Sequence, residues 1–314
     1  MSEVKKIATR DSYGSCLAEL ANVYENLVVL DADLAHATKT IKFRNVCPER
    51  HVDCGIAEAN MMSVAAGLAA TGMIPFASSF AMFAAGRAFE QVRNSIGYPH
   101  LNVKIGATHA GISVGEDGAT HQCNEDIALM RTIPGMVVIN PSDDVETKAA
   151  VKAAIEYEGP VYLRFGRLAV PVINENPEYT FEIGKGVELK SGSDVTIIAS
   201  GLPVSESLEA AKILESEGIQ ARVINIHTIK PIDREIILKA ARETGKLVTV
   251  EEHSIIGGLG DAVIDAIISE NPVPVYKIGV EDKYGISGPA TELLDLYGLT
   301  AKHIANKIRV ILGK

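Results

Sequence analysis

Tryptophan is absent from this chain of 314 residues, and aromatic residues make up only 5% of it. Positive charge is also limited, because 30 Lys and Arg stand against 40 Asp and Glu, a formal net charge of −10. Nucleic acids and anionic membranes bind positively charged surfaces, so the charge balance argues against both kinds of partner. It does not exclude a small anionic ligand, since a few arginines can reverse the potential inside a cleft.

Cysteine is scarce as well, with four in the chain: Cys16, Cys47, Cys54 and Cys123. No two of them form a C-x-x-C pair, and no His/Cys spacing is typical of a zinc site. The first residues, MSEVKKIATRDSYG, contain no apolar segment of the kind found in a secretory signal. We therefore expect a reduced, cytoplasmic protein.

Long hydrophobic runs without interruption are missing too. The uncharged stretch Ala59–Gly86 is long enough to span a bilayer, but Gly72 and Pro75 interrupt it. It is rich in Ala, Ser and Gly rather than Leu and Ile, which is not typical of a lipid-facing helix. The stretch therefore predicts a buried helix, a short strand and a second buried helix.

What the sequence does contain is a regular alternation of strand-like and helical segments. In the first half, strands are predicted at Leu27–Leu30, Ile74–Ala77, Asn102–Ala107, Met136–Ile139 and Val161–Arg164. Helices are predicted at Ile56–Thr71, at Phe80–Ile96, and from an N-cap at Ser142 to about Tyr157. This alternation predicts a parallel sheet covered by helices on both faces.

A second α/β unit follows a segment with little periodicity, residues 168–186, which contains two prolines and predicts a linker. Beyond it, strands are predicted at Val195–Ala199, Ala221–Ile226, Leu247–Val250 and Val273–Ile278. Helices are predicted from about Val204, Ile232 and Gly260, and near Ala301–Leu312. We therefore expect an α/β protein with two parallel-sheet domains, residues 1–170 and 186–314, joined by a linker at 171–185.

Unusual polar residues follow the predicted strands, where ligands bind in open α/β sheets. The strand ending near Ala107 leads into a long loop, THAGISVGEDGATHQ, with three glycines and two histidines. A plain surface loop is one interpretation, but the density of glycine and histidine favours a functional one. Arg10, ahead of the first predicted helix, and Arg164, at the end of a strand, have guanidinium groups suited to phosphate or to an ordinary ion pair.

Glu58 and two phenylalanines are further candidates. Glu58 opens the uncharged helix, where an acid either stabilises the helix N-terminus or serves as a proton partner for a ligand nitrogen. Phe80 and Phe83 share one helix face, where they belong to the core or line a pocket. Position in the sequence does not decide between these alternatives.

Taken together, the segments GIAE at 55–58, Phe80 with RAFEQV at 87–92, and the loop from Thr108-His109 to GEDGATH at 115–121 resemble transketolase. Residues 8–170 are similar to its pyrimidine-binding domain, and residues 186–314 to its smaller C-terminal domain. The resemblance implies a thiamine-diphosphate enzyme that moves a two-carbon ketol unit from a ketose phosphate to an aldose phosphate.

The same resemblance implies roles for individual residues. Glu58 matches the acid that activates the aminopyrimidine, and Phe80 and Phe83 match the aromatic pocket around that ring. His121 is implied as catalytic, and the implied substrate contacts are Arg10, Asp33, His109, Asp117, His121 and Arg164.

The chain lacks the Gly-Asp-Gly motif that transketolase uses for the diphosphate and its metal. We therefore expect it to be the C-terminal subunit of a split transketolase. An N-terminal subunit would supply the ligands for Mg²⁺ or Ca²⁺, and the two subunits would form an α2β2 assembly. Three alternatives stay open: a 1-deoxy-D-xylulose-5-phosphate synthase, a 2-oxo-acid dehydrogenase E1 β subunit, and an inactive scaffolding or regulatory homologue.

Overall fold

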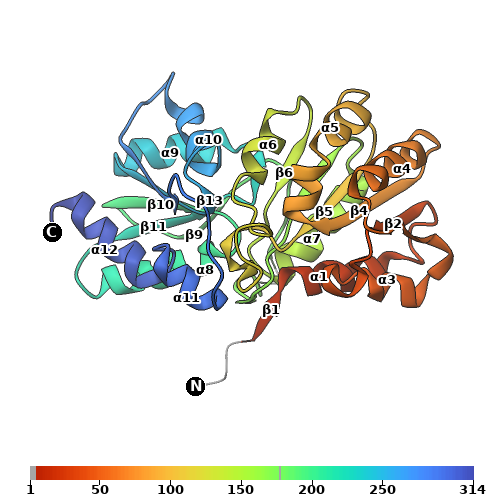
Figure 1. Cartoon of the computed structure of the whole chain (residues 1–314). Coiled ribbons are helices and arrows are strands. Elements are labelled where there is room, and N and C mark those ends of the chain that lie inside the picture. The colour runs from red at the N-terminus through yellow and green to blue at the C-terminus, as the bar shows by residue number, and fades with distance from the viewer. Residues whose placement is uncertain (1–4, 177) are drawn as a thin grey trace.

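Two sheets lie side by side in the computed structural model, which describes residues 5–176 and 178–314 (Figure 1). The larger sheet has seven strands in the order β12-β6-β7-β5-β4-β2-β3, and the smaller has five in the order β14-β13-β10-β11-β9. The predicted α/β class with two parallel sheets is confirmed. Each sheet also carries one antiparallel strand at an edge, β12 on β6 and β9 on β11.

The strands of the larger sheet are β2 (Leu27–Asp31), β3 (His51–Asp53), β4 (Ile74–Phe80), β5 (Lys104–Thr108), β6 (Val137–Ile139), β7 (Val161–Arg164) and β12 (Thr228–Lys230). Those of the smaller sheet are β9 (Val187–Lys190), β10 (Val195–Ala199), β11 (Ala221–Asn225), β13 (Leu247–Ser254) and β14 (Val275–Val280). A separate antiparallel pair joins β1 (Lys6–Ala8) to β8 (Ala169–Pro171). All residues of β2, β4, β5 and β7 are buried, as expected of strands covered on both faces.

The helices before the second sheet are α1 (Thr9–Leu20), α2 (Ala35–Thr38), α3 (Ile41–Val46), α4 (Glu58–Ala70), α5 (Phe89–Gln91), α6 (Asp126–Thr132) and α7 (Asp144–Glu156). Those that follow are α8 (Pro203–Glu215), α9 (Arg234–Thr244), α10 (Leu259–Ile267), α11 (Ala290–Leu296) and α12 (Ala301–Leu312). Buried side chains of α1 and α7 pack on one face of the larger sheet, and those of α4 and α6 on the other. None of the helices in the described residues is both long and apolar enough to cross a membrane.

The predicted helix Phe80–Ile96 was wrong as a single regular element. Strand β4 runs on to Phe80 because its ladder with β5 continues to the pair Phe80–Thr108. The segment beyond it consists of two π-helical stretches, Met82–Arg87 and Val92–Gly97, on either side of α5. Such widened turns are frequent at functional sites, and the first of the two, Met82–Arg87, lies beside the candidate site described below.

Two smaller expectations about helix starts were also wrong. Asp143, not Ser142, caps α7, because its carboxylate accepts a hydrogen bond from the Glu146 amide at 2.9 Å. The Ser142 hydroxyl instead donates to the Glu146 carboxylate at 2.8 Å. Arg10 lies inside α1 rather than ahead of it, because that helix begins at Thr9.

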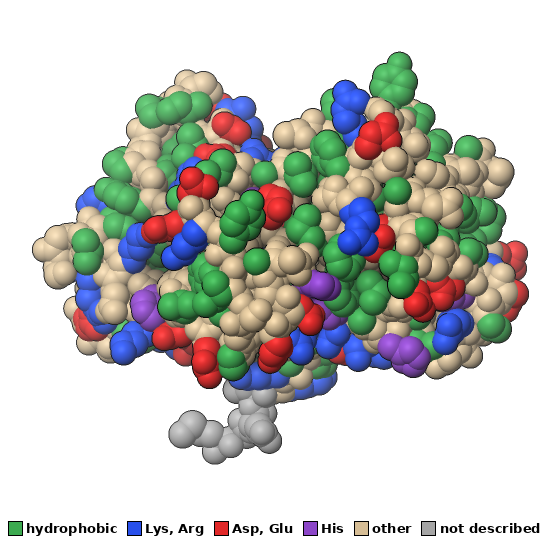
Figure 2. Space-filling view, in the orientation of Figure 1, with side chains coloured by type: hydrophobic (Ala, Val, Ile, Leu, Met, Phe, Trp, Pro, Cys, Tyr) green, Lys and Arg blue, Asp and Glu red, His purple; other side chains and the backbone are tan. Residues whose placement is uncertain are grey.

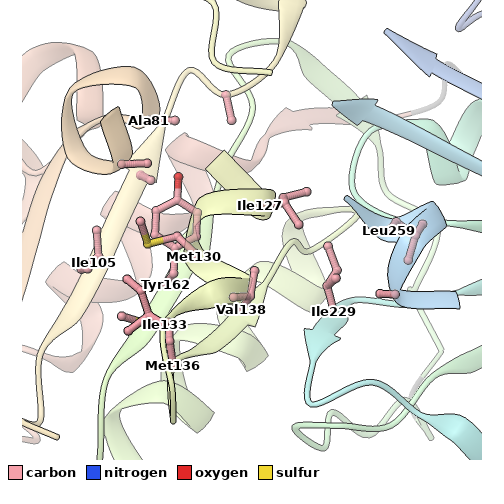
Figure 3. Packing of buried hydrophobic residues seen from close by; sticks show 14 of the residues in the cluster. Ala81, Ile105, Ile127, Met130, Ile133, Met136, Val138, Tyr162, Ile229 and Leu259 are labelled. Carbon is pink, nitrogen blue, oxygen red and sulfur yellow. The ribbon is translucent and has the colours of Figure 1, made fainter. Parts of the chain in front are cut away.

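One hydrophobic cluster crosses from the larger sheet to elements that follow the linker. Figure 3 shows Tyr162 of β7 and Met130 of α6 on one side, with Ile229 of β12 and Leu259 of α10 on the other. Strand β12 helps this cluster to cross, because it pairs with β6 of the larger sheet although it lies beyond the predicted linker in the sequence. On the outer surface, acidic and basic side chains are interspersed without a large area of one sign in the view of Figure 2.

Candidate active site

Three neighbouring elements bring the predicted aminopyrimidine-binding residues together. Phe80 ends β4, His109 directly follows β5, and Glu58 begins α4, which packs on β4. Strands β4 and β5 are parallel neighbours, so the segments after their carboxyl ends lie at one edge of the sheet. The structure therefore places all three residues at the edge where an α/β sheet binds ligands.

Glu58 is a buried carboxylate with one cationic partner. Its side chain is 3% exposed, whereas that of Arg87 is 52% exposed. One guanidinium nitrogen of Arg87 donates to both carboxylate oxygens, at 2.9 and 3.0 Å. The buried carboxylate is thus paired with a cation that reaches in from the surface.

Aromatic rings extend outward from this ion pair. The rings of Phe80 and Phe83 are stacked with centroids 5.8 Å apart and planes 12° from parallel. The Arg87 guanidinium lies 4.3 Å from the centre of the Phe83 ring. His109 stacks on Phe80 at 3.9 Å, and the ring of His121 approaches Phe83 edge-on at 5.3 Å. The flat apolar faces, the carboxylate and the two histidines therefore form one continuous cluster.

His109 is held as a neutral ring. Arg10 can only donate, so its contact of 3.0 Å with Nε2 makes that nitrogen an acceptor and leaves Nδ1–H to donate to Thr108 Oγ1 at 2.9 Å. Burial, together with the positive charge of Arg10, lowers the pKa of His109 to about 3. The residue also has a positive φ of 56°, an uncommon conformation that is typical of functional loops.

Arg10 lies next to this histidine from the other side of the site. Its guanidinium also donates to the Ala37 carbonyl at 3.0 Å, and burial lowers its pKa. Part of the guanidinium, Nε, is buried and has no partner among the described residues. Arg10 therefore has one donor that none of the described residues uses.

The structure does not bring Arg164 to this group. Arg164 is buried, with its Nε donating to Asp126 at 2.8 Å and its Nη2 to the Glu252 carbonyl at 2.9 Å. Arg167, three residues on, is closer to the site: its charge helps to lower the pKa of His109, and it donates to Glu116 at 2.7 Å. Strand β7 ends at Arg164, so its side chain turns into the packed interior while Arg167 lies on the loop beyond.

The two acids predicted to contact the substrate, Asp33 and Asp117, are exposed. Asp33 follows β2 with a positive φ of 60°, and Asp117 lies in the glycine-rich loop. Within residues 5–176 and 178–314, neither carboxylate has a hydrogen-bonding partner, so both are free to meet a ligand. No group of three or more His, Cys, Asp or Glu among these described residues is arranged to hold a metal ion.

A cavity of about 1010 Å³ opens beside the cluster and shares Phe83 and Arg87 with it. Thr120 and Gln122 of the glycine-rich loop also line it, and the segment 281–285 closes it from beyond β14. Sequence reasoning missed Arg87, Arg167, Gln122 and this C-terminal segment. Of these, only Arg87 could have been identified from the sequence, because it is four residues from Phe83 and helical spacing places the two on one face.

The fold and the site define a two-unit α/β protein. Its larger unit has a buried acid and stacked aromatic rings at the ligand-binding edge of the sheet, and a smaller α/β unit follows. Residues 5–172 match the transketolase pyrimidine-binding domain, and residues 184–304 match the transketolase C-terminal domain. The chain belongs to the transketolase family.

Three similarities give the relationship more detail. The chain is 55% identical to a putative transketolase C-terminal section of Methanocaldococcus jannaschii, over 95% of this chain and 94% of that one. It is 39% identical to human transketolase over 98% of its own length but only 50% of the human protein. A solved split-gene transketolase, described as an inactive β4 tetramer, superposes with a TM-score of 0.89 at 52% identity, covering 98% and 99% of the two chains. The motif-based resemblance to the C-terminal half of transketolase is confirmed.

Proposed function

We propose that this chain is the C-terminal subunit of a two-chain transketolase that moves a two-carbon ketol unit from a ketose phosphate to an aldose phosphate. Xylulose 5-phosphate and ribose 5-phosphate are the proposed donor and acceptor types. The observation that carries the proposal is the Glu58 carboxylate, 3% exposed, at the start of α4 beside the stacked rings of Phe80 and Phe83.

These residues fit the aminopyrimidine of thiamine diphosphate. Among the described residues, the side-chain partner of Glu58 is Arg87, which is half exposed and so can be displaced. Phe80 and Phe83 offer flat apolar faces next to that carboxylate. When bound, the cofactor supplies a nucleophilic carbon and an electron sink for cleavage of the donor's carbon–carbon bond.

Glu58 has the central role among this chain's residues. Its carboxyl group holds a proton at N1′ of the aminopyrimidine, an interaction that its low exposure strengthens because bulk water does not compete. The Phe80 and Phe83 rings orient the pyrimidine, and the His109 ring behind Phe80 keeps that ring in place. The role of these side chains is to bind and orient one heterocycle.

The remaining predicted residues face the sugar. His121, next to Phe83, moves protons at the reacting carbons. His109 is a further substrate contact, and in this structure its two ring nitrogens bond to Arg10 and Thr108. Asp33 and Asp117 accept hydrogen bonds from sugar hydroxyls, because a carboxylate is an acceptor only. Arg10 binds the sugar phosphate, and Arg167 takes the role first predicted for Arg164, whose guanidinium is engaged with Asp126.

A second chain completes the site in this proposal. An N-terminal subunit would bind the diphosphate and the Mg²⁺ or Ca²⁺ ion, and two copies of each subunit would assemble in the cytoplasm. The half-length match to human transketolase and the similarity to a split-gene transketolase support this arrangement.

The test is two-carbon transfer by the assembled pair. This chain, mixed with an N-terminal transketolase section, thiamine diphosphate and Mg²⁺, should transfer the ketol unit from xylulose 5-phosphate to ribose 5-phosphate. Glu58→Gln should lower kcat by about 10²–10⁴-fold, the range for losing a proton-transfer group, with unchanged assembly by gel filtration. Glu90→Gln, an exposed acid on α5, is the matched control and should retain activity.

The identity of the sugar is tested in the same assay. Relatives at 45% and 42% identity are a 6-deoxy-6-sulfo-D-fructose transketolase subunit and an apulose-4-phosphate transketolase subunit, so both sugars belong in the donor panel. Activity with one of these alone would contradict the pentose phosphate assignment but not the reaction class. Decarboxylation of pyruvate without any ketol transfer would contradict the class itself.

A further inference from the structure

The glycine-rich loop rests against residues that lie beyond the linker. Gln122, at the end of the loop, is 3% exposed and donates from Nε2 to two carbonyls. One is Ile112 at 3.1 Å, near the start of the same loop, and the other is Ile286 at 2.9 Å, beyond β14. A single amide thus ties both ends of the loop to the C-terminal segment Gly285–Ser287.

Glycines allow this contact to be close. A Cβ on Gly285 would lie 1.8 Å from Gln122 Oε1, and a Cβ on Gly118 would lie 2.3 Å from Ser287 Oγ. Gly118 also has a φ of +71°, a conformation that side chains disfavour. There is no room for a methyl group on either side of the contact.

A second attachment comes from the end of β13. Glu252 is buried and accepts a hydrogen bond from the Ser113 amide at 2.7 Å. Gly111, which has a φ of +78°, lies so close that an added Cβ would be 2.4 Å from the Glu252 carboxyl carbon. Strand β13 and the segment Gly285–Ser287 beyond β14 therefore contact the loop near its beginning, in its middle and at its end.

We infer that the C-terminal unit sets the geometry of the catalytic loop, with Gln122 as a positioning residue fixed by the segment Gly285–Ser287. Gln122 adjoins His121, and the loop also carries Asp117, so a shift of the amide moves the groups that face the sugar. The functional meaning of this inference rests on the proposed function. It gives the C-terminal unit a part in substrate alignment rather than in assembly alone.

Gly285→Ala is the decisive variant. The φ of Gly285 is outside the left-handed region, so alanine is compatible with the backbone, and the three atoms nearest to its methyl group all belong to the Gln122 amide. Because that amide is buried and hydrogen-bonded to both carbonyls, it cannot move without breaking those bonds. We expect kcat/KM for ketol transfer to fall about 10- to 100-fold, as small misplacements of catalytic groups do.

Two further variants separate alignment from folding. Gly288→Ala is the matched control, because its methyl would meet only the end of the Leu293 side chain, at 3.3 Å, and should leave kcat/KM unchanged. In a Gln122→Ala background the clash is absent, so Gly285→Ala should then cost less than about twofold, a non-additivity expected of residues in contact.

Hydrogen exchange gives a readout that does not depend on activity. In the chain alone, Gly285→Ala should accelerate exchange of the amides in residues 111–122, and Gly288→Ala should not. Unchanged exchange and kcat/KM in Gly285→Ala would overturn the inference, and so would a lower melting temperature with no change in either. If the wild-type pair shows no transfer, the proposed function fails, while the exchange result still decides whether this segment positions the loop.

Discussion

At the scale of single residues, His109 shows how the site controls protonation. Its ring lies between Phe80 and Arg10, and its pKa is lowered to about 3 by burial first and by the arginine charge second. An unperturbed histidine titrates near 6.5, so His109 stays neutral over the range in which most enzymes work. The neutral ring therefore accepts from Arg10 and donates to Thr108 at the same time, and it adds no positive charge to the site.

This lowered pKa predicts a pH dependence of stability. Below pH 6.5 the unfolded chain takes up a proton at His109 that the folded chain does not bind until about pH 3. The free energy of unfolding should therefore fall as pH drops from 6.5 toward 3, and His109→Gln should show a shallower fall.

Urea denaturation between pH 4 and 8 measures this effect. His253, whose pKa burial lowers to about 4, contributes in the same direction and should remain in the variant's profile. His36→Gln, at an exposed position, is the control and should leave the slope as in the wild type. An equal slope in His109→Gln and wild type would contradict the assignment.

At the scale of elements, the start of α7 links a helix cap to the segment after β8. Asp143 is fully buried, accepts from the Glu146 amide, and accepts again from the amides of Ile173 and Asn174 at 2.8 Å each. One carboxylate thus satisfies the helix N-terminus and holds the chain that leaves the larger sheet.

Asp143→Ala should therefore destabilise the protein by more than a lost cap alone. A cap contributes about 1 kcal/mol, and the two further charged hydrogen bonds raise the expected loss to about 3 kcal/mol. Equilibrium urea unfolding measures it. Thr300→Ala is the control, because Thr300 precedes α12 without a side-chain cap bond. If Asp143→Ala lowered the free energy of unfolding no more than this control does, the proposed role of Asp143 would be contradicted.

The element after β4 explains one failure of the sequence pattern. Apolar spacing predicted a regular helix from Phe80, and the structure has a strand end followed by a π-helical stretch. Periodicity detects an apolar face but not a widened turn, because the hydrogen-bond shift depends on what packs around it. That turn places Phe83 and Arg87 next to Glu58.

At the scale of the whole molecule, Arg164 joins elements from both sides of the linker. It connects β7 to Asp126 of α6 and to the Glu252 carbonyl of β13, and Tyr162 also donates to Asp126 at 2.8 Å. This buried polar group sits between the two sheets, beside the hydrophobic cluster that crosses from one to the other.

Arg164→Met should cost about 3–5 kcal/mol in the free energy of unfolding, because it leaves the Asp126 charge buried without its partner. Adding Asp126→Leu to the Arg164→Met variant should restore part of the lost free energy of unfolding. Arg234→Met, which removes an exposed ion pair with Glu270, is the control and should have little effect. Unchanged stability with a raised KM for the sugar phosphate would contradict this role and support Arg164 as a substrate ligand.

Much of the site could be inferred from residue type and order. Glu58, Phe80, His109 and His121 were predicted, and they do lie together, since strand ends and helix starts are local features that apolar periodicity marks out. Arg164 differs because an arginine at the end of a strand can turn inward or outward, and only the packing of α6 and β13 against β7 determines which.

The sequence by itself determined the α/β alternation, the family and the residue types of the loop, because hydrophobic spacing and motif order are properties of neighbouring residues. Only the tertiary structure decided that Arg87 pairs with Glu58, that Arg167 rather than Arg164 lies near the site, and that Gly285 leaves room for Gln122 across 163 positions of sequence. These contacts join segments far apart in the chain, and their formation depends on how two sheets pack, which no local pattern encodes.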